Sequence, residues 1–133
     1  MNAFIVEVEN RPGEIARVTE KLAARGVNIL VHSLGMGERG VIDFVASDED
    51  ASRSALSDAG ISYREVPVFH VKMEDIPGQA FSTSQKLAEA GVNIEFWLAV
   101  DTSKENFIVA VGVDNSEAAR AALGDQLTTF TYA

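Results

Sequence analysis

Each of two Pro-Gly turns in this sequence follows a polar side chain that suits the binding of a small charged molecule. Asn10 precedes Pro12-Gly13, and Asp75 precedes Pro77-Gly78. If a helix begins at each turn, its first backbone N–H groups lack partners and attract a carboxylate, and glycine lets a ligand approach that backbone closely. An amide side chain offers donors and an acceptor, while an aspartate pairs with an ammonium group. Together these residue types suit a free amino acid.

The two turns belong to an internal duplication. Residues 9–29 align with residues 74–94 at an offset of 65, and ten of the 21 paired positions are identical. At average residue usage, about one or two identities are expected by chance. Both copies end in the same four residues, Gly26-Val27-Asn28-Ile29 and Gly91-Val92-Asn93-Ile94. The chain therefore consists of two equivalent halves, each with an asparagine-containing second turn.

Length and composition indicate a globular protein built from two small modules. The 133 residues fit one ordinary domain or two modules of about 65 residues. Modules this small bury only about 60% of their unfolded surface, so we expect each half to pack on the other or on a second copy. The hydrophobic fraction of 47% is typical of globular proteins. The absence of cysteine excludes disulfides, thiol catalysis and zinc–thiolate sites.

Charge and hydropathy argue against two further classes of partner. A net charge of −9 repels phosphate backbones, which disfavours nucleic-acid binding. No apolar run approaches the ~20 residues that a membrane span needs, and the N-terminus lacks the basic region of a signal peptide. We therefore expect a cytoplasmic protein that binds neither nucleic acid nor a membrane.

The spacing of apolar residues in the first half predicts the element order βαββαβ. Ala3–Glu9 alternates as a strand, with Phe4, Val6 and Val8 on one face. Pro12 suits the first position of a helix, and Gly26 is expected just beyond its end. The apolar stripe of that helix would be Ile15, Val18, Leu22 and Ala23. The other expected elements are strands Val27–Leu34 and Val41–Ala46 around a Gly35–Gly40 turn, a helix capped by Asp50 and closed by Gly60, and strand Ile61–Val66.

The second half repeats this order. Its expected elements are Phe69–Met73, Ala80–Ala90, Val92–Val100, Asn106–Val113, Glu117–Leu123 and Thr128–Tyr132. Right-handed crossovers then give an α+β fold of two tandem ferredoxin-like modules, each with an antiparallel sheet and both helices on one face. The expected modules are residues 1–67 and 68–133, because only Pro67 interrupts the extended segment between them.

The Pro-Gly and Gly-Val-Asn-Ile turns, at this spacing after a strand, resemble the ACT domain, a family of small βαββαβ modules that bind amino acids and regulate amino-acid metabolism. The first repeat resembles most closely the regulatory ACT module of phosphoglycerate dehydrogenase, and the whole chain resembles a stand-alone tandem ACT protein. That family has a histidine two residues before the turn asparagine, whereas Val8 and Met73 occupy those positions here.

The resemblance implies a ligand held between two ACT units, by the turn before the first helix of one and the start of the second strand of the other. Carried over to this sequence, it implies a ligand-binding set of Asn10, Arg11, Pro12, Gly13, Asn28 and Ile29 in the first repeat and Asp75, Ile76, Pro77, Gly78, Asn93 and Ile94 in the second. The implied protein is a non-catalytic amino-acid sensor. It would be a homodimer with a metabolic enzyme as a possible partner.

Each of these residues also has a purely structural interpretation. Asn10 and Asp75 are possible N-caps of the following helices, and Asn28 and Asn93 are possible turn formers with self-bonding side chains. Arg11 fits a solvated turn. His32 and His70 fall in strands without a partner at metal-ligand spacing, so neither a metal nor a cofactor is expected.

Two other functions remain open at this stage. Arg11 lies where acylphosphatase-like hydrolases place a phosphate-binding arginine, but the chain lacks their glycine-rich loop, and no nucleophile–base pair stands out. A ligand-free interaction module is the second alternative, in which exposed sheet edges or helix faces would make oligomers without a small molecule.

Overall fold

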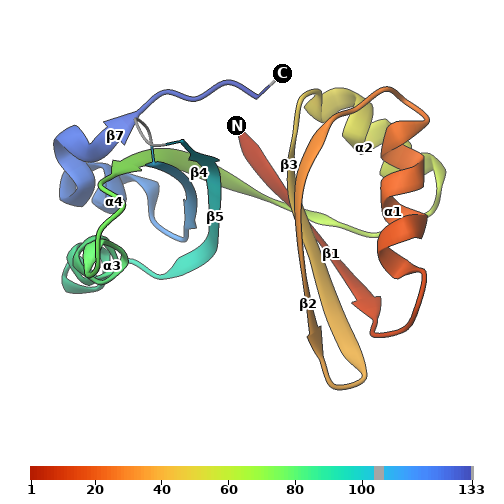
Figure 1. Ribbon diagram of the computed structural model, residues 1–133, viewed down its shortest axis with the longest axis horizontal. Coiled ribbons are helices and arrows are strands. Elements are labelled where there is room, and N and C mark those ends of the chain that lie inside the picture. Colours follow the sequence, from red (N-terminus) through yellow and green to blue (C-terminus); the bar gives the residue numbers. More distant parts are fainter. Residues whose placement is uncertain (104–106, 133) are drawn as a thin grey trace. The chain divides into compact units, whose positions relative to one another are not determined.

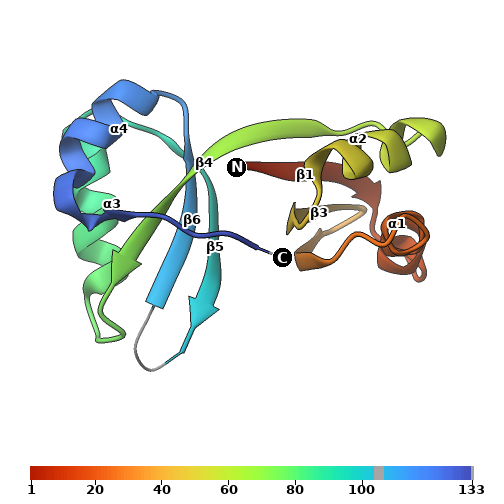
Figure 2. The ribbon, with the colours of Figure 1, turned by 90° about the horizontal axis from the view of Figure 1, so that it is seen from above.

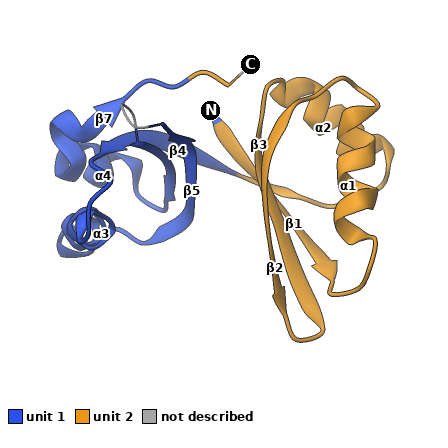
Figure 3. Ribbon diagram, in the orientation of Figure 1, with its two compact units in different colours: residues 1, 66–130 blue, residues 2–65, 131–133 orange. Residues whose placement is uncertain are grey.

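The computed structural model describes residues 1–103 and 107–132, and the chain forms two compact units (Figure 3). One unit is built on residues 2–65 and the other on residues 66–130. Strand β4 (Arg64–Met73) begins in the first unit and continues into the second.

The first unit is a sheet covered on one face by two helices. Its elements are β1 (Asn2–Glu9), α1 (Glu14–Ala23), β2 (Ile29–Met36), β3 (Arg39–Ala46), α2 (Glu49–Asp58) and the first residues of β4. Strand β3 lies between β1 and β2 and is antiparallel to both. Both helices lie on the same side of these strands (Figure 1).

The second unit repeats this plan. It contains the rest of β4, then α3 (Gln79–Glu89), β5 (Ile94–Thr102), β6 (Phe107–Val113), α4 (Ser116–Leu123), the 3-10 turn η1 (Gly124–Gln126) and the short β7 (Leu127–Thr128). Its strand order is β5-β6-β4-β7, and every neighbouring pair is antiparallel. Helices α3 and α4 cover one face (Figure 2). The predicted fold class, two βαββαβ modules, is therefore confirmed.

A core lies between sheet and helices in each unit. In the first, the rings of Phe4 and Phe44 stack with centroids 5.0 Å apart, and Phe4, Val6 and Val8 share the buried face as predicted. The apolar stripe of α1 is narrower than predicted, because Glu14, Val18 and Leu22 are its buried residues. Ala23 is exposed, and Ile15 is 44% exposed. The second core contains Val71, Leu87, Val109, Val111, Ala119 and Leu123 among others.

The hairpin of the first unit is longer and tighter than the sequence suggested. The predicted turn Gly35–Gly40 is wrong, because Gly35 pairs with Gly40 within the ladder and Met36 pairs with Arg39. Only Gly37 and Glu38 remain in the turn. Glycine usually interrupts strands, but here an approaching side chain occupies the space beside Gly35, as described below.

Three residues do not have the roles predicted for them at the ends of helices and strands. Helix α1 begins at Glu14 after Gly13, so Pro12 precedes the helix instead of starting it. Asp48, not Asp50, caps α2, since its carboxylate accepts the Ala51 N–H at 2.9 Å. Pro67 does not interrupt the chain, because β4 runs through it without a break; a proline is tolerated in a strand where no ladder donor is required.

The remaining strand ends also shift. Strand β5 begins two residues later than predicted, and the last strand is reduced to Leu127–Thr128. Asn106, the predicted first residue of the strand Asn106–Val113, lies outside the described residues. The predicted glycine end of the first helix is confirmed. Gly26 has φ 68°, its N–H bonds to Ala23 O at 2.9 Å, and Val27 N–H bonds to Leu22 O at 3.1 Å.

We predict that acid destabilises the protein through His70. This β4 residue is 9% exposed, and its Nε2 has no hydrogen-bond partner within the described residues. Burial, and secondarily the positive chain start, lower the pKa of His70 below its ordinary 6.5. The unfolded chain therefore takes up a proton more readily than the folded one, so stability is intact above about pH 6.5 and falls below it.

The measurement is the melting temperature at about pH 7.5 and about pH 5.5. His70→Gln should reduce the loss between these values, because glutamine does not take up a proton in this pH range. An equal loss of stability in wild type and His70→Gln would contradict this account.

Candidate functional site

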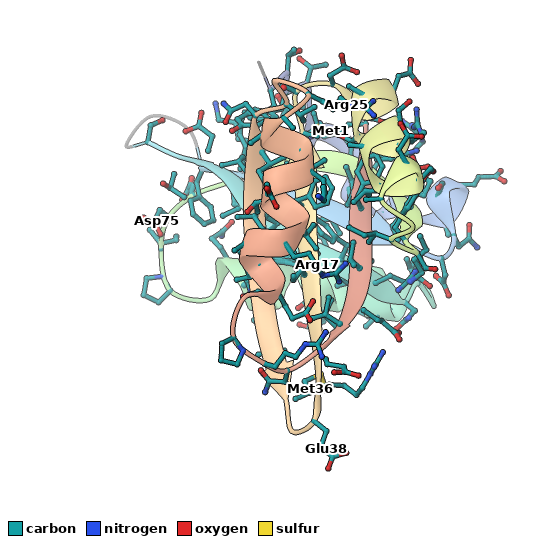
Figure 4. The ribbon with its side chains drawn as sticks, turned by 90° about the vertical axis from the view of Figure 1, so that its right-hand side faces the viewer. Met1, Arg17, Arg25, Met36, Glu38 and Asp75 are labelled. Atoms are coloured by element: carbon teal, nitrogen blue, oxygen red, sulfur yellow. The ribbon has the colours of Figure 1, made fainter. Side chains whose placement is uncertain are left out.

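The turn between β1 and α1 is fixed to the tip of the β2–β3 hairpin by Asn10. Its backbone N–H donates to Glu38 O at 2.9 Å, and its side-chain Nδ2 donates to Gly37 O at 2.9 Å. Figure 4 shows the hairpin tip, marked by Met36 and Glu38, at the same end of the unit as this turn. A Cβ at Gly35 would lie 2.7 Å from Asn10 Nδ2. Glycine at position 35 therefore allows the Asn10 amide to lie against the hairpin.

The N-cap interpretation of Asn10 and Asp75 is wrong. The N-cap residues are Gly13 at φ 90° and Gly78 at φ 93°, and among the described residues no side chain bonds the first N–H groups of α1 or α3. Left-handed backbone at these two positions favours glycine. The first intrahelical bond of α1 runs from Arg17 N to Gly13 O at 2.9 Å. The N–H groups of residues 14–16 precede it and are available to an anion.

A pocket of about 260 Å³ lies between the β1–α1 turn and the hairpin. Asn10, Arg11 and Gly13 line it from the turn, three of the four predicted residues there. Its apolar lining includes Ile15 of α1 and Leu34 of β2, which are both partly exposed. One side of the pocket thus offers amide, guanidinium and helix N–H groups, and the other offers aliphatic carbon.

Glu14 is the site residue that the sequence analysis missed. It is the first residue of α1, and its side chain is only 8% exposed. Hydrogen bonds from Arg11, and then from Arg17, lower the pKa of this carboxyl below its usual 4.5, so it is ionised at neutral pH. The sequence does contain a pattern that indicates pairing of this acid, because arginines stand three residues before and three residues after it.

The structure does not bring Asn28 and Ile29 to this pocket. Strands β1 and β2 run in the same direction, and Ile29 pairs with Ala46, whereas Met36, at the other end of β2, pairs with Arg39. Seven residues along a strand correspond to about 24 Å. The backbone of Asn28 bonds to Ser47, but its side-chain amide has no hydrogen bond within the described part of the chain. The self-bonding interpretation of Asn28 therefore lacks support.

The second unit has the same separation between its two predicted turns. Asp75, Ile76, Pro77 and Gly78 are exposed at the end of β4, beyond the Met73–Phe107 pair, while Ile94 pairs with Val113 at the other end of β5. Asn93 and Ile94 line a groove of about 490 Å³ together with the exposed ring of Phe81. As at Asn28, the backbone of Asn93 is bonded, here to Asp114, and its side-chain amide has no bond within residues 1–103 and 107–132.

Comparison with known families identifies these modules. The family model for an ACT domain pair matches residues 1–131. The chain belongs to the ACT domain pair family. Both units are accordingly ACT modules, and the suspected resemblance is confirmed. A search of curated proteins found no match.

Solved structures share the fold of these ACT modules at low sequence identity. Protein BT0572 from Bacteroides thetaiotaomicron is 22% identical with a TM-score of 0.79, over 96% of this chain and 90% of that one. The ligand-free regulatory subunit of aspartate kinase from Thermus thermophilus is 24% identical with a TM-score of 0.62, over 92% and 87%. Its counterpart from Thermus flavus is 21% identical with a TM-score of 0.58, over 94% and 92%.

Within the described residues, no helix has both the length and the apolar character needed to cross a membrane. In the same part of the chain, histidine and acidic side chains do not gather in groups of three or more that would hold a metal ion.

We predict that Gly35→Ala displaces the Asn10 amide while the fold persists. The new methyl group would overlap the end of a flexible side chain, so Asn10 can rotate away and lose its bond to Gly37 O. The expected loss of stability is about 0.5–1.5 kcal/mol, the net value of one hydrogen bond. Chemical denaturation of Gly35→Ala, Asn10→Ala and the double variant measures it.

The double variant is the control for this prediction. If the methyl group acts through Asn10, Gly35→Ala should add little in the Asn10→Ala background. Full additivity of the two stability losses would show that Gly35 and Asn10 act independently.

Proposed function

We propose that this chain is a non-catalytic amino-acid-binding regulatory protein with modules at residues 1–67 and 68–133. The observation that carries the proposal is the pocket of the first module, where Asn10 lies beside the uncapped start of α1. ACT family membership supports a regulatory role, as does the similarity of the fold to a regulatory subunit of aspartate kinase.

The pocket matches the chemistry of an amino acid. The ligand carboxylate would meet the N–H groups at the start of α1, where the partial positive charge of the helix favours an anion. The Asn10 side-chain oxygen and the Glu9 carboxylate would accept from the ligand ammonium, and both residues line the pocket. The ligand side chain would lie along Ile15 and Leu34.

A complete site would need a second ACT module. Asn28 and Asn93 carry amides without hydrogen-bond partners in the described residues, at the far end of their own sheets from the Pro-Gly turns. We propose that the start of β2 or β5 from another module closes the ligand against a turn. Binding would then shift the equilibrium between two assemblies of the protein. A metabolic enzyme would respond to this shift through contact with the protein.

The hydrolase alternative loses its main support in this geometry. Two carboxylates, of Glu14 and Glu9, lie 2.7 and 2.8 Å from the Arg11 guanidinium, and their negative charge repels a doubly charged phosphate more strongly than a singly charged carboxylate. The ligand-free interaction module keeps one supporting observation. Strand β2 is an edge whose register against β3 is uninterrupted, and it exposes Leu34 and Met36 by 54% and 63%.

Thermal unfolding in the presence of each of the twenty amino acids at millimolar concentration tests the proposal. A ligand at 100 times its dissociation constant adds about 2.7 kcal/mol of stability, which raises the melting temperature by several degrees. We expect one chemical class to stabilise the wild type and Asn10→Ala to abolish the shift.

The exposed Ser54→Ala substitution on α2 serves as a control and should retain the full shift. If no amino acid stabilises the wild type, the sensor hypothesis fails and the exposed edge of β2 becomes the better guide to function.

A further inference from the structure

The start of α1 carries a cluster of alternating charges around a buried acid. Glu14 Oε1 accepts from Arg11 Nε at 2.7 Å, and its Oε2 accepts from Arg17 Nε and Nη2 at 3.1 and 2.9 Å. Both oxygens of a carboxylate that is 8% exposed are therefore occupied by guanidinium groups. Buried acids are rare in proteins unless they are paired in this way.

Arg11 is the arginine of this cluster that lines the pocket. Its side chain is 62% exposed, and beyond Glu14 it contacts only the exposed Glu9 among the ion pairs of the described residues, through Nη1 at 2.8 Å. An exposed ion pair of that kind contributes little stability and exchanges readily. The guanidinium is thus fixed on its Nε side by a buried partner and remains able to form a bidentate pair with an incoming carboxylate.

The second module is an internal control, because it has the same turn without these charges. At the 65-residue offset, Arg11, Glu14 and Arg17 correspond to Ile76, Gln79 and Ser82. The backbone is nevertheless the same: Ser82 N bonds to Gly78 O at 2.9 Å as Arg17 N does to Gly13 O, and Gly78 shares the left-handed φ of Gly13. The turn therefore forms without the ionic cluster, which indicates another role for the cluster in the first module.

We propose that Glu14 is a positioning residue that holds Arg11 as the carboxylate-binding group of the first module, and that this module takes aliphatic α-amino acids. This inference rests on the proposed sensor function and deepens it. Ile15 and Leu34 supply the aliphatic wall, and the pocket volume of about 260 Å³ admits a side chain of branched aliphatic size. The second module, with Ile76 in place of the arginine, does not recognise a carboxylate by this route.

Calorimetric titration of the whole chain with L-leucine and with L-leucinamide tests the proposal, because only the first ligand carries a carboxylate. L-Valine and L-isoleucine are tested in the same way. Wild type should bind the amino acid about tenfold or more tightly than its amide, since a hydrogen bond to a charged group is worth that much. Arg11→Gln should reduce this preference to the part that the N–H groups at the start of α1 supply, and leave amide binding nearly unchanged.

Glu14→Gln is the decisive variant. Glutamine already occupies the equivalent position 79 on the same backbone, so the fold should tolerate it. If Glu14 acts by positioning Arg11, the variant should lose as much of the preference for leucine over leucinamide as Arg11→Gln does, and combining the two substitutions should add nothing. Gln79→Ala in the second module is the matched control and should keep the preference.

The outcomes separate this inference from the proposed function. If amino acids bind but Glu14→Gln weakens leucine and leucinamide equally, or weakens neither, the positioning role is wrong while the sensor function stands. If only non-aliphatic amino acids bind, the assigned ligand class is wrong, and the same variants are compared with that amino acid and its amide. If the wild type binds no amino acid, the proposed function and this inference fail together.

Discussion

The contact of the Asn10 side chain with the β2–β3 hairpin is the constraint on which the site depends. Two bonds from one residue, N–H to Glu38 O and Nδ2 to Gly37 O, join segments that are 27 and 28 residues apart in the chain. The contact requires a glycine at position 35, because a side chain there would occupy the same space. It positions the start of α1 and the edge of β2 as the two walls of one pocket, which neither element would form alone.

The two duplicated modules share their backbone features but differ in the side chains around the first turn. In both modules a strand, a Pro-Gly turn with left-handed glycine, a helix and a glycine-terminated C-cap recur with matching hydrogen bonds. The side chains on this frame differ. The first module surrounds its turn with two arginines and a buried glutamate, whereas the second exposes Ile76 and Phe81. One fold thus presents two chemically distinct surfaces.

Sequence patterns predicted the elements well where a repeating apolar face defined them. The burial of Phe4, Val6 and Val8, the glycine end of α1 and the repeated βαββαβ order all follow from local periodicity and from the duplication. The errors lie where a distant residue decides local structure. Gly35 and Gly40 were predicted to form a turn, because local sequence does not show that Asn10, 25 residues from Gly35, packs beside that glycine. Pro67 was predicted to interrupt the extended segment, although β4 continues through it.

Asn10, Arg11 and Gly13 were predicted from residue type and do line the pocket. Glu14 was missed because an acid at a helix start is ordinarily solvated, and only the packed structure shows its burial.

In the proposed function, an amino acid binds where the turn of the first module meets its hairpin. Two-dimensional ¹H–¹⁵N correlation spectra of the labelled chain, recorded while a mixture of the twenty amino acids is added at millimolar concentration, test it most directly. The amide signals of residues 33–38 and of residues 10–16, except Pro12, which has no N–H, should shift first and by the largest amounts. Shifts confined to the second module, or a spectrum that does not change, would contradict it.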